Sequence, residues 1–513
     1  MRRRFEPHPP HHCHQGIRWF FGRPDALTRM KSPRVLAGAV WADASIASLR
    51  IPSMVLKIGF GAGRLGGWVM LGFRFANPGQ AIAALFAGAI ALGTALLSLP
   101  ISSADGQRTD FVDALFTSVS AVCVTGLVTV DTGSYWSTFG QCVILLLIQL
   151  GGLGIMTTAT IVALLFFNRM GLRARSAIQV ETKSISASNL RGVVRRIVAY
   201  SLAIECVLAT VLAWRFWSRY DYSLPDAMYD GVFHSVSAFN NAGFGLYRDN
   251  LMGFVNDPVI LGSIAAAVVV GGLGFPVVFE LVRVWRRPSR WSVLAKVTVV
   301  MTVFLIGLGS VVFYGAEASN PATLGGLSRP NAAIAAVFTA IMPRTAGFNA
   351  IDIAAMMPES LALTNIFMFI GGGSAGTAGG IKVTTVGLLA FVVWAELRGR
   401  TDVTLARRRV PSVNQRQALS VAMLGLVVVT GFFLTLLAVT NDAPDAVLFE
   451  TISAFGTVGL STGITAGLSD PAKVLLAALM FIGRLGPLTL ASALALRERP
   501  ERTRLPEERI IVG

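Results

Sequence analysis

Four short stretches of the chain share one pattern, in which a phenylalanine is followed nine or ten residues later by a glycine. They cover residues 116–127, 233–244, 338–348 and 449–460, and their glycines lie 117, 104 and 112 positions apart. Such a period indicates an internal fourfold repeat. Each stretch predicts a short helix that runs into an irregular loop with glycine at a fixed place, and four such loops can surround one axis.

Loops of this kind expose backbone carbonyls that replace the water shell of a dehydrated cation, as in potassium filters. Glycine permits the required φ values without a Cβ clash, and irregular backbone at membrane depth must be buried or line a watery cavity. We call these segments filter loops 1 to 4. The residues predicted to bind potassium are each glycine and the two residues before it: Val124, Thr125, Gly126, Asn241, Ala242, Gly243, Thr345, Ala346, Gly347, Thr457, Val458 and Gly459.

The composition is that of a membrane protein. Hydrophobic residues make up 53% of the 513 residues and charged residues only 14%, whereas a soluble domain is nearer a quarter charged. Apolar runs long enough to cross about 30 Å of hydrocarbon recur along the chain. The net charge of +16 comes from arginines clustered between apolar segments, which argues against a nucleic-acid partner. The four cysteines form no CxxC pair and no disulfide framework.

The predicted fold class is an all-α membrane protein with four parallel repeats of helix, pore helix and helix around a central pore. This gives eight transmembrane helices and four pore helices that cross half the membrane. Asp110 and Asp226 are expected to cap pore helices at their starts. The helix boundaries predict a basic N-terminal extension and four repeats, the last with the C-terminal tail: 1–78, 79–170, 190–285, 290–398 and 414–513.

Loop charge predicts the orientation. The connections 168–196, 282–296 and 397–416 are rich in lysine and arginine and belong in the cytoplasm, whereas the links beside the filter loops lean acidic. Eight crossings then place both termini in the cytoplasm. No cleavable signal peptide follows the basic start of the chain, so the first apolar segment is expected to act as an uncleaved signal.

The N-terminal extension has two interpretations. Its His/Cys tract at 8–14 is of a type that can bind a transition metal, or it is part of a basic tail with no fixed structure. Residues 53–75 are expected to form an amphipathic helix that contacts anionic membrane lipid. The GxGxxG match at 61–66 follows no predicted strand, so nucleotide binding there is not expected.

A run of small residues interrupts the second helix of repeat three. So many Gly, Ser and Thr residues weaken a helix, and the other repeats have no such insertion. We predict a movable gate just inside the filter; the alternative is a kinked, closely packed helix. The gate residues are Gly371, Gly372, Gly373, Ser374, Gly376, Thr377, Gly379, Gly380 and Lys382, together with Arg484 of repeat four.

Three charged residues fall inside predicted spans. Arg484 is expected to bond carbonyls of the 371–380 segment or to repel cations, because an intramembrane arginine is costly and usually functional; the alternative is that it reaches the cytoplasmic surface. Lys382 and Glu205 are expected near a helix end or a water pocket. No catalytic triad or metal-ligand pair recurs, so an enzyme is not expected.

The four loops resemble those of the Trk/Ktr/HKT superfamily of potassium transporters over about residues 80–513, and the tail at 504–513 resembles Ktr-type subunits. The matching segments are 124–133, 239–244, 343–349 and 456–463. The resemblance implies potassium uptake across the bacterial plasma membrane, a homodimer and a cytosolic nucleotide-binding, Rossmann-type regulatory ring. In this superfamily glycine at all four filters favours potassium over sodium.

Several points stay open at this stage. Potassium is the expected substrate and no covalent cofactor is expected, while coupling to sodium or protons is undetermined. Potassium symport is compatible with the sequence. The rival from another class is an inverted-repeat cation or solute symporter, which would need broken helices in antiparallel pairs. An intramembrane enzyme is a third interpretation, which the missing catalytic set disfavours.

Overall fold

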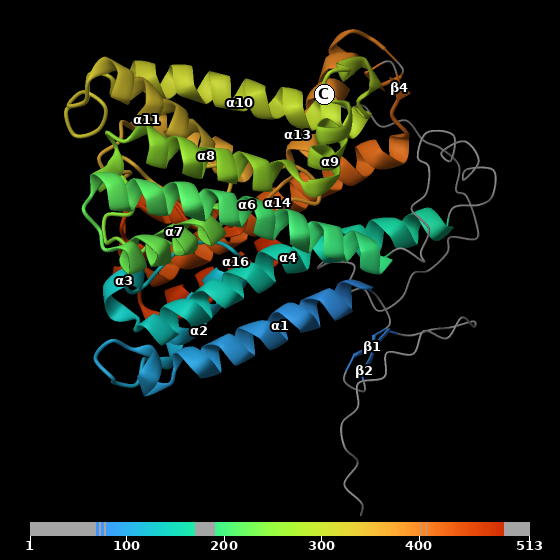
Figure 1. The fold of residues 1–513 in the computed structure, drawn as a ribbon. Coiled ribbons are helices and arrows are strands. Elements are labelled where there is room, and N and C mark those ends of the chain that lie inside the picture. Colours follow the sequence, from blue (N-terminus) through green and yellow to red (C-terminus); the bar gives the residue numbers. More distant parts are fainter. Residues whose placement is uncertain are drawn as a thin grey trace, which may run out of the picture. The chain divides into compact units, whose positions relative to one another are not determined.

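The computed structural model describes residues 68–70, 73–75, 78–169, 190–400, 402–406 and 408–486. The His/Cys tract at 8–14, the 61–66 match and the tail at 504–513 lie outside these residues. Figure 1 shows long helices running side by side, with the shorter helices α2, α7 and α11 beginning at one common end of the bundle. The first two repeats comprise α1 (Pro78–Leu97), α2 (Phe111–Val122) and α4 (Thr138–Arg169), then α6 (Leu190–Arg219), α7 (Leu224–Phe239), α8 (Pro258–Leu273) and α9 (Phe275–Val284).

The last two repeats follow the same order. They comprise α10 (Val293–Glu317), α11 (Arg329–Ile341), α12 (Pro358–Phe369) and α13 (Val383–Leu397), then α14 (Ser412–Val439), α15 (Pro444–Gly456) and α16 (Asp470–Leu485). The prediction of four parallel helix, pore helix and helix repeats is confirmed. Short elements fill the links: α3 (Thr132–Tyr135), β3 (Thr404–Leu405), β4 (Arg408–Arg409), and the 3-10 turns Pro100–Ser102, Met252–Phe254, Pro288–Arg290 and Thr465–Gly467.

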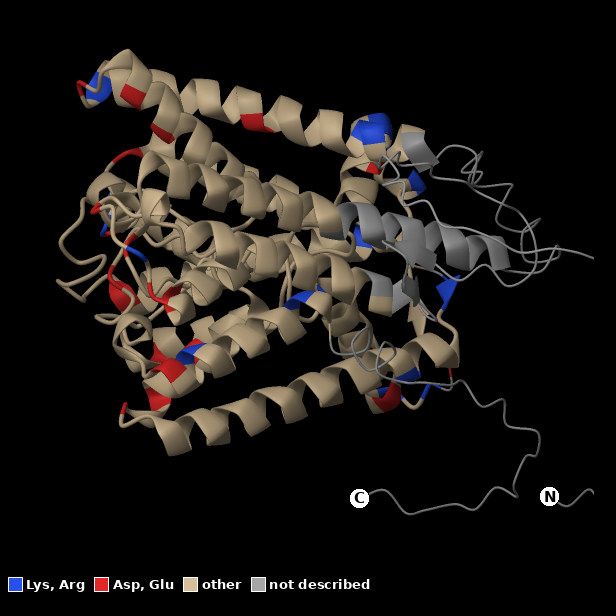
Figure 2. Cartoon of the chain, turned by 90° about the horizontal axis from the view of Figure 1, so that it is seen from below, with Lys and Arg blue, Asp and Glu red and all other residues tan. Residues whose placement is uncertain are grey.

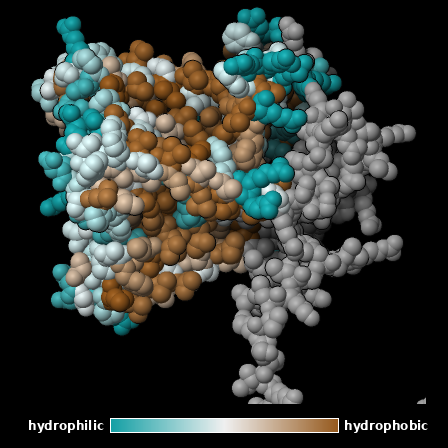
Figure 3. Space-filling model, viewed as in Figure 1, coloured by the Kyte–Doolittle hydropathy of each residue, from teal (hydrophilic) through white to brown (hydrophobic). Residues whose placement is uncertain are grey.

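The surface and the helix lengths agree with a protein that crosses the membrane several times. Among the described residues, Gly192–Arg219, Val293–Glu317 and Ser412–Val439 are long and apolar enough to span by themselves, and the bent pair α8–α9 counts as a fourth span. Shorter apolar helical stretches are Ile82–Leu97, Phe111–Val122, Thr138–Gly154 and Val383–Leu397. Figure 3 shows a broad hydrophobic band over the helices, with hydrophilic residues gathered at the end where the pore helices begin.

Two second helices are interrupted. In repeat three, helix α12 ends at Phe369 and α13 begins at Val383, as the glycine-rich run predicts. In repeat two, the second segment is not one continuous helix, because the chain bends by 102° between α8 and α9. Gly274 adopts φ 88° and ψ 136° at this break, and Pro276 follows in the first turn of α9. Proline removes a helical N–H and disfavours helical backbone before it.

The segment before α1 also differs from its prediction. Its described part forms two short antiparallel strands, β1 (Trp68–Met70) and β2 (Phe73–Phe75), rather than the end of an amphipathic helix.

The repeated phenylalanine anchors each pore helix in the core. Phe116, Phe233, Phe338 and Phe449 are each only 1% exposed. Asp110 accepts a hydrogen bond from the N–H of Val112 at 2.8 Å and caps α2 as predicted. In repeat two the cap is Ser223 instead, and Asp226 lies in the first turn, where it accepts the Ser223 hydroxyl at 2.5 Å.

Candidate functional site

The four filter loops share one unusual backbone. The residue two positions before each glycine has a positive φ in every loop: Val124 at 56°, Asn241 at 60°, Thr345 at 74° and Thr457 at 49°. The glycines also have positive φ, at 94°, 72°, 71° and 94° for Gly126, Gly243, Gly347 and Gly459. Non-glycine residues adopt this region rarely and at a cost. The same strain in four segments far apart in sequence indicates a common functional geometry.

The loops contact one another in cyclic order. A Cβ on Gly126 would lie 2.3 Å from the carbonyl oxygen of Ala242, and one on Gly243 would lie 2.8 Å from that of Ala346. The next two contacts close the ring: Gly347 faces the Val458 oxygen at 2.5 Å, and Gly459 faces the Thr125 oxygen at 2.1 Å. Loop 1 therefore meets loop 2, loop 2 meets loop 3, loop 3 meets loop 4, and loop 4 meets loop 1. The four loops surround a single axis, and no side chain larger than hydrogen fits at the glycines.

A serine four residues after the repeated phenylalanine holds filter loops 1 and 4 against their own pore helices. In loop 1, Ser120 accepts two N–H groups, that of Thr125 on its carbonyl at 2.8 Å and that of Gly126 on its hydroxyl at 3.0 Å. Ser453 accepts the N–H of Val458 at 2.9 Å and that of Gly459 at 3.1 Å in the same way. These N–H groups point toward the pore helices. Their peptide carbonyls are thereby left to face other directions, including the contacts between loops.

Loops 2 and 3 vary this arrangement. The N–H of Ala242 bonds the carbonyl of Ser237 at 2.8 Å, while the Ser237 hydroxyl donates to the carbonyl of Phe244 at 2.7 Å. In loop 3 a methionine replaces the serine, and the N–H of Ala346 bonds the Met342 carbonyl at 3.0 Å. The ring is consequently only pseudo-symmetric.

The surroundings of the ring are negative and rich in oxygen. Each pore helix directs its C-terminal carbonyl end, which carries about half a negative charge, toward the loops. The hydroxyls of Thr125, Thr345 and Thr457 are buried and have no hydrogen-bond partner within the part of the chain that is described. Buried polar atoms normally have partners, so these atoms and the loop carbonyls make a site suited to a monovalent cation.

The 371–382 loop lies against the filter loops. The Thr377 hydroxyl donates to Asn241 Oδ1 of loop 2 at 3.0 Å. A Cβ on Gly379 would lie 2.0 Å from Thr457 Oγ1 of loop 4. The N–H of Gly373 bonds the carbonyl of Gly272 on α8 at 2.7 Å. The loop therefore packs against two of the four filter loops, at the C-terminal ends of the pore helices α7 and α15.

The ends of this loop pair with each other. The N–H of Gly371 bonds the Ile381 carbonyl at 2.8 Å, and the N–H of Val383 bonds the Gly372 carbonyl at 3.0 Å. Lys382, which was expected near a helix end, precedes α13 as its N-cap residue, and its Nζ donates to the Ala378 carbonyl. The alternative prediction of a kinked but continuous helix is therefore wrong, because a closed loop separates α12 from α13.

Arg484 joins this loop to two other repeats. Its guanidinium donates to the carbonyl of Thr377, and its Nη2 donates to the carbonyl of Gly151 on α4 at 3.2 Å. Only 3% of the residue is exposed. The expected bond to a carbonyl of the 371–380 segment is confirmed, and the alternative that Arg484 reaches the surface is wrong.

Gly151, Gly271 and Gly483 lie against the pore helices, and the sequence analysis did not predict this contact. A Cβ on each would lie 2.0 Å from a carbonyl oxygen near the end of its own pore helix, that of Val122, Phe239 and Phe455 respectively. The second helices carry the aligned patterns Gly-Gly-Leu-Gly, Gly-Gly-Leu-Gly, Gly-Gly-Gly-Ser and Gly-Arg-Leu-Gly, which begin at 151, 271, 371 and 483. Arg484 thus occupies a position that is glycine in the other three repeats.

The surroundings of two further buried charged residues, Glu205 and Arg344, were not predicted from the sequence. Glu205 does not lie at a helix end: it is 4% exposed in the middle of α6 and is bonded by Gln149 of α4. Arg344, next to filter loop 3, is 7% exposed and donates to the Thr302 hydroxyl at 3.1 Å. Neither contact follows from local sequence, since 56 and 42 positions separate the partners.

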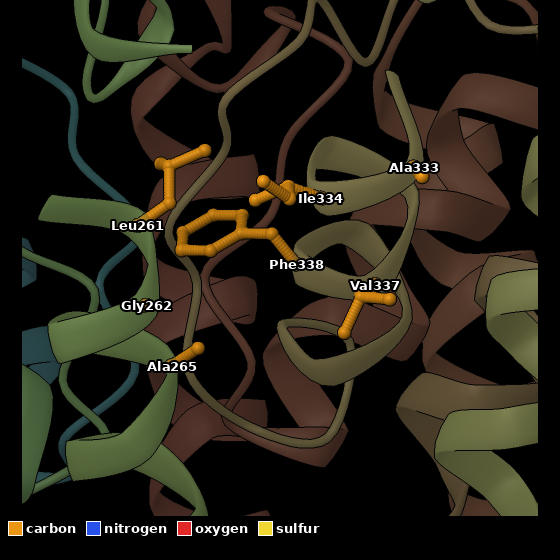
Figure 4. A pocket seen from close by; sticks show the side chains of 7 residues that line it. All are labelled: Leu261, Gly262, Ala265, Ala333, Ile334, Val337 and Phe338. Atoms are coloured by element: carbon orange, nitrogen blue, oxygen red, sulfur yellow. The ribbon is translucent and has the colours of Figure 1, made fainter. Parts of the chain in front are cut away.

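The described residues also include an apolar groove outside the filter loops. The groove, of about 250 Å³, lies between α8 and α11. Figure 4 shows Leu261 and Ala265 facing Ile334 and Phe338 across it. All its lining residues are apolar, so it does not belong to an ion path. Within the described ranges no group of three His, Cys, Asp or Glu side chains is placed to hold a metal ion.

Comparisons with known proteins agree with this geometry. Residues 89–501 match the TrkH family model, which is described as a cation transport protein. The chain is 39% identical over 443 residues to the Ktr system potassium uptake protein B of Bacillus subtilis, covering 86% of this chain and 97% of the relative. The protein of the same name from Vibrio alginolyticus is 38% identical, with 83% and 93% covered.

Two further matches are a relative named for both potassium and sodium, and a solved structure of another potassium transporter. The potassium/sodium uptake protein NtpJ of Enterococcus hirae is 34% identical, with 85% of this chain and 97% of the relative covered. The crystal structure of the potassium transporter TrkH from Vibrio parahaemolyticus superposes with a TM-score of 0.66 at 19% identity, covering 82% of this chain and 86% of that one. The chain belongs to the TrkH family of cation transport proteins.

Proposed function

We propose that this chain is the pore-forming subunit of a potassium uptake system in a bacterial plasma membrane. The observation that carries the proposal is the closed ring of four filter loops, in which each glycine faces a carbonyl oxygen of the next loop. Carbonyl oxygens in such a ring replace the hydration shell of potassium. Two of the relatives named above are potassium uptake proteins, and an inward-negative potential contributes about 2.3 kcal/mol per charge per 100 mV to entry.

The residues assigned to potassium are those predicted from the sequence, the glycine and its two predecessors in each loop. Their buried position, the shared positive φ and the unpartnered threonine hydroxyls support this assignment. An inverted-repeat symporter is not favoured, because all four repeats run in the same order from outer helix to pore helix to second helix.

The 371–382 loop and Arg484 form the barrier beneath the filter in this proposal. The loop contacts filter loops 2 and 4, and Arg484 fixes it to α4. Breaking the Arg484 contacts would release the loop from the pore axis. Opening therefore requires the loop to exchange its contacts with α8 and Arg484 for others.

In the proposed orientation the filter loops lie outside the cell and both termini lie in the cytoplasm. Figure 2 shows that Asp and Glu gather at the end of the bundle where the pore helices begin, while the other end carries mainly Lys and Arg. This is the distribution that the positive-inside rule predicts. The basic connections at 282–296 and 397–416 then form a cytoplasmic face suited to a nucleotide-binding regulatory ring, and a second copy of the chain completes a dimer.

Complementation tests the proposed function. The chain is expressed in a bacterial strain that lacks its own potassium uptake systems, and growth is followed from micromolar to millimolar potassium. Growth at low potassium that depends on this chain is expected. A chain that reaches the membrane at normal level and supports no growth, alone or with a cytosolic regulator from a Ktr system, contradicts the proposal.

A further inference from the structure

Glu205 is a buried carboxylate inside the membrane-spanning part of the protein. It is 4% exposed, and the Gln149 amide nitrogen donates to both of its oxygens at 3.1 Å. No ion pair involving it occurs among the described residues, whose ion pairs all lie elsewhere. Burying a carboxylate without a cation is costly, and intramembrane acids usually serve a function.

The amide partners of Glu205 lead directly to filter loop 2. Asn240 Nδ2 donates to Gln149 Oε1 at 2.7 Å and also lies 3.4 Å from Glu205 Oε1. Asn240 ends the pore helix α7 as its C-cap and immediately precedes Asn241, whose φ of 60° begins the strained part of the loop. The Asn240 side chain thus bonds Gln149 on α4 of repeat one and Glu205 on α6 of its own repeat, in addition to the carbonyl of Val236 on α7 at 2.9 Å.

The same contacts continue to the 371–382 loop. Asn241 Oδ1 accepts the Thr377 hydroxyl at 3.0 Å, and the Thr377 carbonyl accepts Arg484. Arg484 returns to α4 through the carbonyl of Gly151, two positions after Gln149. Glu205 therefore bonds to a connected set of residues that includes a filter loop and the 371–382 loop. Hydrogen bonds and short stretches of backbone join these residues.

The other repeats do not reproduce this support. The residues that occupy the position of Asn240, three before the filter glycine, are Cys123, Arg344 and Gly456. None of them carries a side-chain amide that could donate to Gln149 and Glu205 as Asn240 Nδ2 does. In filter loop 2 the residue three before the glycine is thus held by a buried carboxylate, whereas the buried carboxylate of Glu450 in repeat four accepts Ser461 and Thr462, beyond the glycine of filter loop 4.

We propose that Glu205 is a positioning residue for potassium selectivity. It orients Gln149 and Asn240, and through them it holds Asn241 and the carbonyl of Ala242 in place within the ring. The inference rests on the proposed function and extends it to a residue outside the pore. Glu205 acts through other residues and does not touch the ion.

Three variants test this role in purified protein reconstituted into vesicles. Glu205→Ala removes both acceptor oxygens, and Glu205→Gln keeps the shape and one acceptor. Ser235→Ala is the matched control, because the buried Ser235 hydroxyl bonds only the backbone carbonyl of Glu205, at 2.6 Å, and does not reach the carboxylate. Rubidium uptake is measured with potassium and sodium as competitors, giving KM and maximal rate for each variant.

Glu205→Ala is expected to lower the preference for potassium over sodium about tenfold, equivalent to about 1.4 kcal/mol, mainly by raising the KM for potassium. Glu205→Gln should recover most of this loss, and Ser235→Ala should keep the parent selectivity. A parent-like selectivity for Glu205→Ala overturns the inference, as does a loss confined to the maximal rate or shared equally by Ser235→Ala.

A second measurement separates this inference from the proposed function. The melting temperature of each detergent-purified protein is compared in potassium and sodium chloride. The parent should be more stable in potassium, and Glu205→Ala should lose this difference. If the parent transports no potassium, the proposed function fails, yet an ion-specific melting difference that Glu205→Ala removes still supports the positioning role. Equal differences in the parent and Glu205→Ala overturn it.

Discussion

Replacing Gly126 by serine should reduce selectivity because the ring has no space for a Cβ there. The Cβ would lie 2.3 Å from the Ala242 carbonyl oxygen, whereas real Cβ atoms do not approach below 3.0 Å, so one loop must move by about 0.7 Å. The φ of 94° adds strain, of about 1–3 kcal/mol for a side chain in such a region. If this strain is relieved by moving the carbonyl, the preference for potassium over sodium falls about fivefold to a hundredfold, since 1.4 kcal/mol is tenfold.

The assay is rubidium and sodium uptake into vesicles containing the purified protein under an inside-negative potential. Gly88→Ser in α1 is the matched control, because a Cβ there meets no atom within 4 Å. Unchanged selectivity in Gly126→Ser, with normal protein in the membrane, would refute the role of this loop. An equal loss in Gly88→Ser would refute the steric reasoning.

Three other changes have expected outcomes. Deleting residues 374–379, or replacing Arg484 by Ala, should raise flux through protein reconstituted without partner subunits, because Arg484 bonds the loop to α4; variants that conduct no better than the parent would show that this loop is not the main barrier. Ser453→Ala leaves a part-buried N–H of filter loop 4 without its acceptor, which costs about 1 kcal/mol, so the melting temperature should fall, unlike that of the exposed control Ser420→Ala. Removing residues 1–50 should leave growth at low potassium nearly intact, and loss of growth at normal membrane levels would show that this segment is required.

The repeats and filter loops could be predicted from the sequence because their chemistry is local. A glycine at a fixed distance from a phenylalanine marks both the end of a pore helix and the tight contact between loops. The buried phenylalanines and the serine bonds then follow from the same short pattern.

The break in the second helix of repeat two could not be predicted from the glycine pattern alone. The segments 151–154 and 271–274 have identical sequences, yet α4 continues through Gly154 and α8 ends before Gly274. Ile155 follows the first segment, whereas the second is followed by Phe275 and Pro276. The proline marks the break; Gly486, where α16 ends, is likewise followed by Pro487 in the sequence.

The partners of the buried charges could not be predicted because they come from distant repeats. Arg484 bonds residues 107 and 333 positions away, and Glu205 meets Gln149 from another repeat. Sequence indicated that these charges needed partners, but only the packing of second helices against neighbouring pore helices determines which carbonyl or amide each one reaches.

In the proposed function all four loops form one potassium filter. Its most direct test is the ratio of potassium to sodium uptake in vesicles for Gly126→Ala, Gly243→Ala, Gly347→Ala and Gly459→Ala, each measured against the parent. Every glycine faces a carbonyl oxygen of the next loop with no room for a methyl group, so all four ratios are predicted to fall. A variant that is present at normal level and keeps the parent ratio would show that its loop does not belong to the filter, and would contradict the fourfold account.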